Sequence, residues 1–99
     1  MLYAIIARDA PNSTTLRPSV RPRHLQYLQG LIDRGRVIFA GPHPAIDSPD
    51  PGPAGFTGSL IIAEFDSLER AKEWCSQDPY TVEGVFRDVE IKPVLQVHP

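Results

Sequence analysis

Apolar residues form four extended runs along the chain, and these predict four strands. The first run, residues 2–7, is almost continuously apolar, as in a central strand that is covered on both faces. Further extended runs occupy residues 36–40, 59–65 and 85–97. The last run contains Pro93, which favours an edge strand or a kink because proline cannot donate to a ladder.

Helical spacing of apolar residues predicts a first helix over about residues 19–34. Ser19 is a suitable N-cap, and Pro22 is tolerated in the first turn, where the amides have no helical partner. Gly35 fits the left-handed position that ends a helix. The predicted buried stripe consists of Leu25, Leu28, Leu31 and Ile32.

A second helix is predicted over residues 67–76. Asp66 and Glu69 have the spacing of a capping box at its start, with aspartate in place of the usual serine or threonine. Residues at helical spacing mark the face that it turns to the core. They are Leu68, Ala71 and Cys75, flanked by Trp74.

Between the second and third predicted strands, residues 41–58 contain five prolines and four glycines. This density predicts a loop that holds neither helix nor strand. A loop of this length is usually functional or mobile, although an ordinary long hairpin connection fits the sequence equally well. Phe56 is expected to anchor the loop, and His43 and Asp47 are expected to be solvated.

The order of the predicted elements is β-α-β-β-α-β, which indicates an α+β, ferredoxin-like sandwich. In this fold both helices cover one face of an antiparallel sheet, and the other face is left open. An uncovered face in a chain with 41% hydrophobic residues predicts a partner. We expect a homodimer that packs through the open sheet face.

Length and composition narrow the class of protein. The 99 residues predict one domain over residues 1–99, and a net charge of −2 gives no reason to expect nucleic-acid binding. No apolar run approaches the roughly 20 residues of a membrane span, and the apolar start lacks the basic segment of a signal peptide. Cys75 is the only cysteine, so a disulfide is excluded within the chain and a cytoplasmic protein is expected.

His24 is the strongest chemical candidate. It lies one turn before Leu28, which places an ionisable ring at the edge of the predicted buried face. Asp78 is the candidate partner, since a carboxylate aimed at an imidazole fixes its tautomer and raises its basicity. Two simpler interpretations stay open: His24 bonded to a backbone carbonyl, and Asp78 only capping a short helical turn that begins at Pro79 and ends near Glu83.

Three arginines, Arg17, Arg21 and Arg23, lie near the predicted start of the first helix. Cations are unfavourable there because the helix dipole already presents positive potential, so the cluster suggests an anion site. The alternative is a solvated turn whose side chains point away. Arg17 and Arg21 are therefore predicted to bind substrate. The other residues predicted to contact substrate are Ser19, Gly41, Pro42 and Tyr80.

Metal and cofactor sites are not expected. His24, His43 and Asp78 have no tight ligand spacing, and no glycine-rich phosphate loop follows a strand. Cys75 lies on a predicted core face, where a thiol is more often a small buried hydrophobe than a nucleophile.

The order and spacing of six short segments, which span almost the whole chain, resemble the YCII-related (YciI-like) family. The segments are Arg21-Pro22, His24-Leu25, Gly35-Arg36, Ala40-Gly41-Pro42, Gly55-Phe56-Thr57-Gly58-Ser59 and Asp78-Pro79-Tyr80. The resemblance implies a dimeric α/β-barrel variant of the ferredoxin-like fold. It also implies an active site built on a histidine–aspartate pair, which would be His24 and Asp78 here. Some members of the family are linked to dehydrochlorination of aromatic-ring degradation intermediates, and most have no assigned reaction.

These observations support two hypotheses of different classes. The first is a small cofactor-free enzyme in which the His24–Asp78 dyad moves a proton on a small anionic or phenolic substrate. Lyase, dehydrochlorinase or isomerase chemistry would suit such a dyad. The second is a non-catalytic, dimeric module that binds a small ligand or has a regulatory role. A dimer in which the polar pair is only structural is a third, simpler case.

Overall fold

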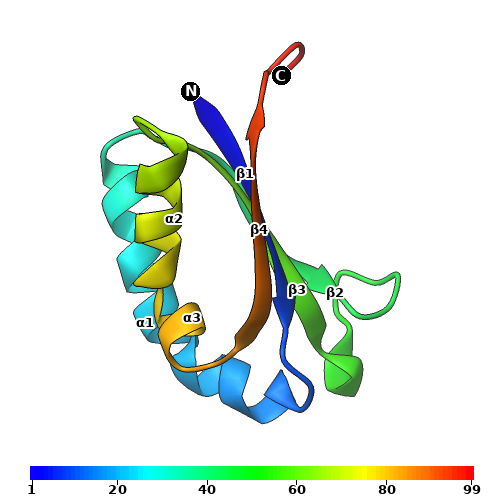
Figure 1. Ribbon diagram of the computed structural model, residues 1–99. Coiled ribbons are helices and arrows are strands. Elements are labelled where there is room, and N and C mark those ends of the chain that lie inside the picture. The colour runs from blue at the N-terminus through cyan, green and yellow to red at the C-terminus, as the bar shows by residue number, and fades with distance from the viewer.

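A computed structural model describes all 99 residues (Figure 1). The predicted β-α-β-β-α-β order is confirmed, with the short helix expected from Pro79 and an additional 3₁₀ helix in the connection between the second and third strands. The elements are β1 (Leu2–Asp9), α1 (Ser13–Asp33), β2 (Val37–Pro44), η1 (Gly52–Ala54), β3 (Phe56–Glu64), α2 (Leu68–Ser76), α3 (Pro79–Val82) and β4 (Phe86–Val94).

The four strands form one antiparallel sheet in the order β2-β3-β1-β4. The helices α1, α2 and α3 lie on one face of this sheet, and the other face is uncovered (Figure 1). The strands are in register at the centre, where Ile5 lies opposite both Ile61 and Ile91. This arrangement confirms the ferredoxin-like α+β fold.

Two hydrophobic clusters fill the space between the sheet and the helices. The larger cluster joins α1 and α2 to the centre of the sheet and includes Ile5, Leu28 and Ile61. The smaller one lies beside α3 and includes Val20 and Tyr80. Its members come from β1, α1, α3 and β4, so four elements meet beside Tyr80.

The first helix starts six residues earlier than the sequence predicts. α1 begins at Ser13, after Asn12 in a left-handed conformation with no side-chain cap, so Ser19 is not the N-cap. Pro18 and Pro22 both lie inside the helix. A proline inside a helix removes one helical hydrogen bond, so local propensity disfavours a helix through this segment. Packing of the buried face against the sheet overrides that local cost.

The buried stripe of α1 also differs from the prediction. Leu28 and Leu31 are buried as expected, whereas Leu25 is 40% exposed and Ile32 is 44% exposed. The stripe continues toward the start of the helix through polar and small residues that an apolar pattern does not reveal. Its full membership is Ser13, Arg17, Val20, His24, Leu28 and Leu31.

The remaining helix ends are mostly as predicted. Gly35 adopts the left-handed conformation after α1, and Asp78 caps α3 by accepting a hydrogen bond from the Tyr80 N–H. The cap of α2 is Ser67 instead of Asp66, because the Ser67 hydroxyl oxygen accepts from the Arg70 N–H.

The proline-rich segment is more ordered than predicted. β2 continues through Pro44, and β3 already begins at Phe56, so the irregular connection is shorter than residues 41–58. Pro42 pairs with Ser59 within the ladder. This pairing is tolerated because β2 is an edge strand, in which an imino nitrogen can face away from its single neighbour.

None of the helices has the length and apolar character needed to cross a membrane.

Candidate active site

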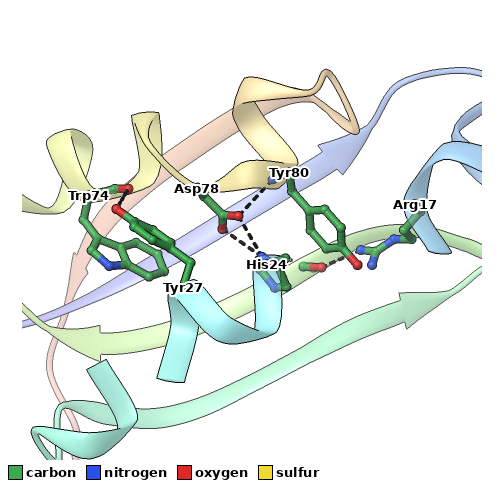
Figure 2. Close-up of polar contacts among 7 residues, drawn as sticks. Arg17, His24, Tyr27, Trp74, Asp78 and Tyr80 are labelled. Carbon is green, nitrogen blue, oxygen red and sulfur yellow. Dashed lines mark hydrogen bonds and ion pairs between the residues drawn. The ribbon is translucent and has the colours of Figure 1, made fainter. Parts of the chain in front are cut away.

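His24 and Asp78 are brought together by two elements far apart in the sequence. His24 lies on the buried face of α1, and Asp78 lies at the N-terminus of α3 (Figure 2). The His24 Nδ1 is 2.8 Å from the Asp78 Oδ1 and 3.0 Å from the Oδ2. His24 is 6% exposed and Asp78 is 1% exposed. The imidazole thus has a buried carboxylate partner, and not the backbone carbonyl of the simpler interpretation.

The contact assigns the two nitrogens of the ring different tasks. A carboxylate can only accept, so Nδ1 carries a hydrogen and donates it to Asp78. In the neutral ring Nε2 is then the unprotonated nitrogen. No group of the protein bonds to Nε2, and it lies on the edge of the ring opposite Asp78. This is the tautomer that a general base requires.

Asp78 holds the histidine and caps a helix at the same time. Its Oδ1 accepts from the Tyr80 N–H at 2.9 Å as well as from His24. Tyr80 in turn stacks on the imidazole, with ring centroids 3.9 Å apart and planes 10° from parallel. Phe86 meets the imidazole edge-on at 6.4 Å. The ring orientation is therefore set by the hydrogen bond to the Asp78 carboxylate and by two aromatic neighbours.

A cleft of about 140 Å³ opens beside His24. A cavity of about 150 Å³ is known to hold one benzene ring in another protein, so this cleft suits a ligand of similar size. Its walls come from α1, from β2 and β3, and from α3. The lining residues are Arg17, Arg21, His24, Leu25, Leu28, Ala40, Gly41, Pro42, Ser59, Ile61 and Tyr80.

Arg17 is held in place by the protein itself. Its Nε donates to the Asp9 Oδ2 at 2.9 Å, and its Nη2 donates to the Gly58 carbonyl at 2.9 Å and the Ser59 hydroxyl at 2.6 Å. The guanidinium also lies over the Tyr80 ring, 4.8 Å from its centroid. Arg17 therefore braces the cleft wall, and only its Nη1 has no partner within the chain.

Asp9 is an unusual partner for Arg17. One carboxylate oxygen, Oδ1, is buried without a hydrogen bond. Burial raises the pKa of the Asp9 carboxyl, and the charge of Arg17 and the hydrogen bond from Ser13 offset this only in part. The ion pair is consequently a costly one that the fold retains beside the cleft.

Arg21 and Tyr80 line the cleft, and neither the Arg21 guanidinium nor the Tyr80 hydroxyl bonds to another residue of the protein. Arg21 is exposed, lines the cleft and forms no ion pair with an acidic side chain. Burial raises the pKa of the Tyr80 hydroxyl, although Arg17 and Arg21 lower it in part, so the phenol stays protonated at neutral pH. Together they offer one cation and one neutral donor.

The other residues predicted for the site have mixed outcomes. Gly41 and Pro42 line the cleft. Ser19 does not: it is exposed on the second turn of α1, and its hydroxyl donates to the Leu16 carbonyl. The arginines do not crowd a helix N-terminus, because α1 starts at Ser13, and Arg23 lies outside the cleft in a 3.6 Å ion pair with Glu83.

Two polar residues of the site were missed by sequence reasoning. Ser59 lies on the core side of β3, in the alternating register of Ile61 and Ala63. A polar residue at such a position is a signal that the pattern could have supplied. Asp9 is the last residue of β1, after its apolar part, where a polar residue alone predicts only the start of a connection.

No group of three or more histidine, cysteine, aspartate or glutamate side chains is arranged to hold a metal ion.

Comparison with protein families and curated proteins gives consistent matches. The profile of the YCII-related domain matches residues 1–95. Protein YciI of Escherichia coli is 56% identical over 97 residues, covering 98% of this chain and 99% of that protein. Fusaric acid biosynthesis protein 2 of Gibberella fujikuroi is 31% identical over 84 residues, covering 85% of this chain and 81% of that protein.

Among solved structures, a similar one is the 5-chloro-2-hydroxyhydroquinone dehydrochlorinase from Burkholderia phenoliruptrix AC1100, in complex with 2,5-dihydroxybenzoquinone. The TM-score is 0.85 and the sequence identity is 26%. The match covers 96% of this chain and 94% of that chain. One similar protein is thus an enzyme that acts on a chlorinated, hydroxylated ring.

Proposed function

The chain belongs to the YCII-related domain family, and from this we propose that it is a small cytoplasmic enzyme that works without a cofactor. The His24–Asp78 dyad is its general acid–base pair. The substrate is a small phenolic or anionic ring, and the reaction is an elimination or an isomerisation. The observation that carries the proposal is the hydrogen bond from the His24 Nδ1 to the buried Asp78 carboxylate, which leaves Nε2 free beside a cleft of one-ring size.

The proposed step uses the two nitrogens of His24 in turn. Nε2 removes a proton from an acidic C–H or O–H of the bound ring, and the electron pair of that bond stays on the substrate. In an elimination, this pair forms a new double bond while a leaving group such as chloride departs with its own bonding pair. In an isomerisation, Nε2 returns the proton to a different atom. The Asp78 carboxylate stabilises the imidazolium formed between the two events.

The cleft supplies binding groups for such a substrate. Arg21 is available to bind a negative charge on the substrate ring, since no side-chain carboxylate of the protein pairs with its guanidinium. The Tyr80 hydroxyl donates to a ring oxygen, and Gly41 with Pro42 forms the opposite wall. Arg17 acts mainly as a positioning residue because Asp9, Gly58 and Ser59 already occupy most of its donors.

Replacing Asp78 with asparagine tests the dyad. An asparagine oxygen in place of Oδ1 can still accept from His24 and from the Tyr80 N–H, so the fold should persist while the negative charge is lost. We expect the proton-transfer rate to fall about 10- to 100-fold. The measurement is incorporation of solvent deuterium, or release of chloride, with chlorinated hydroxyhydroquinones and related phenols as substrates.

The matched control for this variant is Asp88→Asn, which removes a carboxylate from the exposed Arg87–Asp88 pair on β4. It should leave the rate unchanged. Failure of every phenolic and anionic ring to exchange or react with the wild-type protein would contradict the proposed function.

We further propose that two chains associate through the open face of the sheet. Phe39 and Ile38 are 51% and 53% exposed there, and Leu60 and Ile62 lie next to them. An apolar surface of this kind on a chain of 99 residues is better buried against a second copy than left in water. A twofold dimer would use the same patch on both chains.

Light scattering should give a mass of twice the 11.0 kDa of one chain. Phe39→Glu should give the single-chain mass, because a charge at the centre of the patch opposes burial. Ile46→Glu is the matched control, since Ile46 is 52% exposed in the loop after β2 and does not line the patch. Unchanged mass for Phe39→Glu would place any interface elsewhere.

A further inference from the structure

A second cleft of about 320 Å³ lies between α1 and α2 on the helical side of the molecule. It is larger than the cleft beside His24, and the two share no lining residue. Its surface combines aromatic rings with arginines. The rings are Tyr27, Phe65 and Trp74, and the arginines are Arg34, Arg36 and Arg70.

The aromatic floor is rigid. Tyr27 and Trp74 stack with centroids 4.8 Å apart and planes 23° from parallel, and Phe65 approaches Trp74 at 5.8 Å. The Tyr27 hydroxyl donates to the Trp74 carbonyl at 2.7 Å, which ties α1 to α2 (Figure 2). Burial, together with the negative charge of Asp78, raises the pKa of Tyr27 to about 12, so this donor persists at neutral pH. Both ring systems are only half-buried and leave a flat apolar surface for a ligand.

The cationic rim is weakly neutralised. Arg34 has no acidic partner, and its Nε reaches only the Gly30 carbonyl at 3.4 Å. Arg36 is paired with Asp66 at 3.5 Å, but the Asp66 side chain is 81% exposed. Arg70 is paired with Glu73 at the same distance, again on the surface. Exposed ion pairs of this length are weak, so Arg36 and Arg70 can leave their carboxylates for an acceptor with better geometry.

We propose that this cleft binds a small planar aromatic carboxylate, at a site separate from the His24 cleft. The ring packs against the parts of Trp74 and Tyr27 that line the cleft and that their mutual stacking leaves exposed. The carboxylate takes two parallel hydrogen bonds from a guanidinium of the rim, a geometry that matches the fork of arginine. Arg34 is the best placed donor because no carboxylate competes for it.

Trp74 reports directly on this site because it is the only tryptophan in the chain. Benzoate should quench or shift its fluorescence saturably, with a Kd of about 1 mM or tighter. Arg34→Gln should weaken benzoate about tenfold, since it removes a charge-assisted pair. Arg87→Gln, on the far strand β4, should leave the affinity unchanged. His24→Gln should also leave it unchanged, because the two clefts share no lining residue.

Two further probes, one without the charge and one without the ring, test whether binding needs both features. Benzamide has the same ring without the charge, and inorganic phosphate has the charge without a ring. Both should bind much more weakly than benzoate. No saturable response to benzoate, equal affinity for either of these probes, or full affinity in Arg34→Gln would overturn the assignment.

Discussion

Replacing His24 with glutamine should reduce turnover by about 10²- to 10⁴-fold, the range that general acid–base catalysis contributes. Glutamine can still donate to Asp78 from its amide, so the buried carboxylate keeps a partner and the fold should be retained. It cannot accept a substrate proton at the position of Nε2. The measurement is kcat on the substrate that the wild-type protein turns over fastest, with the unfolding midpoint taken on the same preparation.

Arg21→Gln provides the contrast for this experiment. Arg21 lines the cleft and is placed to bind the charge of the substrate without taking part in proton transfer. Its loss should raise KM while kcat stays near the wild-type value. A non-catalytic ligand-binding module would show a different pattern, in which Arg21→Gln weakens the ligand and His24→Gln has little effect. Full turnover in His24→Gln would rule out the dyad as the catalytic group.

Replacing Arg17 with methionine should lower the free energy of unfolding by about 3–5 kcal/mol, the usual result of removing one partner of a buried ion pair. Arg17 is 7% exposed and is the only residue in an ion pair with Asp9, whose pKa the charge of His43 also lowers. The change also leaves the Gly58 carbonyl and the Ser59 hydroxyl without their donor. Urea unfolding at neutral pH measures the effect.

The destabilisation by Arg17→Met should be smaller at acidic pH, because Asp9 can then become neutral. Its pKa in the folded protein is already above the ordinary 3.8, so the neutral form is favoured by folding. The stabilisation that the folded state gains from neutral Asp9 is fully present below pH 3.8. It disappears as the pH rises through the pKa of Asp9 in the folded protein. Without Arg17 the folded pKa rises further, so the free-energy difference between Arg17→Met and wild type should widen with pH.

Asp9→Asn in the Arg17→Met background should recover part of the stability, since it removes the unpaired buried charge. Arg87→Met is the control for a general loss of arginine: its pair with Asp88 is exposed, and the change should stay within about 0.5 kcal/mol. Equal destabilisation by Arg87→Met, or no dependence on pH, would show that the Asp9–Arg17 pair is not the source of the loss.

Local patterns in the sequence were sufficient for the element order and therefore for the fold. Strands reveal themselves through apolar runs and helices through apolar spacing, and both signals depend only on neighbouring residues. Asp78 and Pro79 predicted the cap and start of α3 for the same reason, because a cap is a contact within one turn. His24 and Asp78 are also predicted as a pair, from the chemistry of a carboxylate beside an imidazole and from the resemblance to the YCII-related family.

Tertiary structure alone decided where these patterns end and which polar residues are buried. α1 runs through Pro18 and Pro22 because its face packs on the sheet, and β2 runs through Pro42 because it is an edge strand. Both outcomes depend on contacts with residues far along the chain, and local propensity takes no account of such contacts. The same is true of Arg17, for which the sequence predicts either an anion site or a solvated side chain, and whose guanidinium instead bonds Asp9 and β3. A charged side chain is buried only where a partner far along the chain meets it, and folding is what brings that partner within reach.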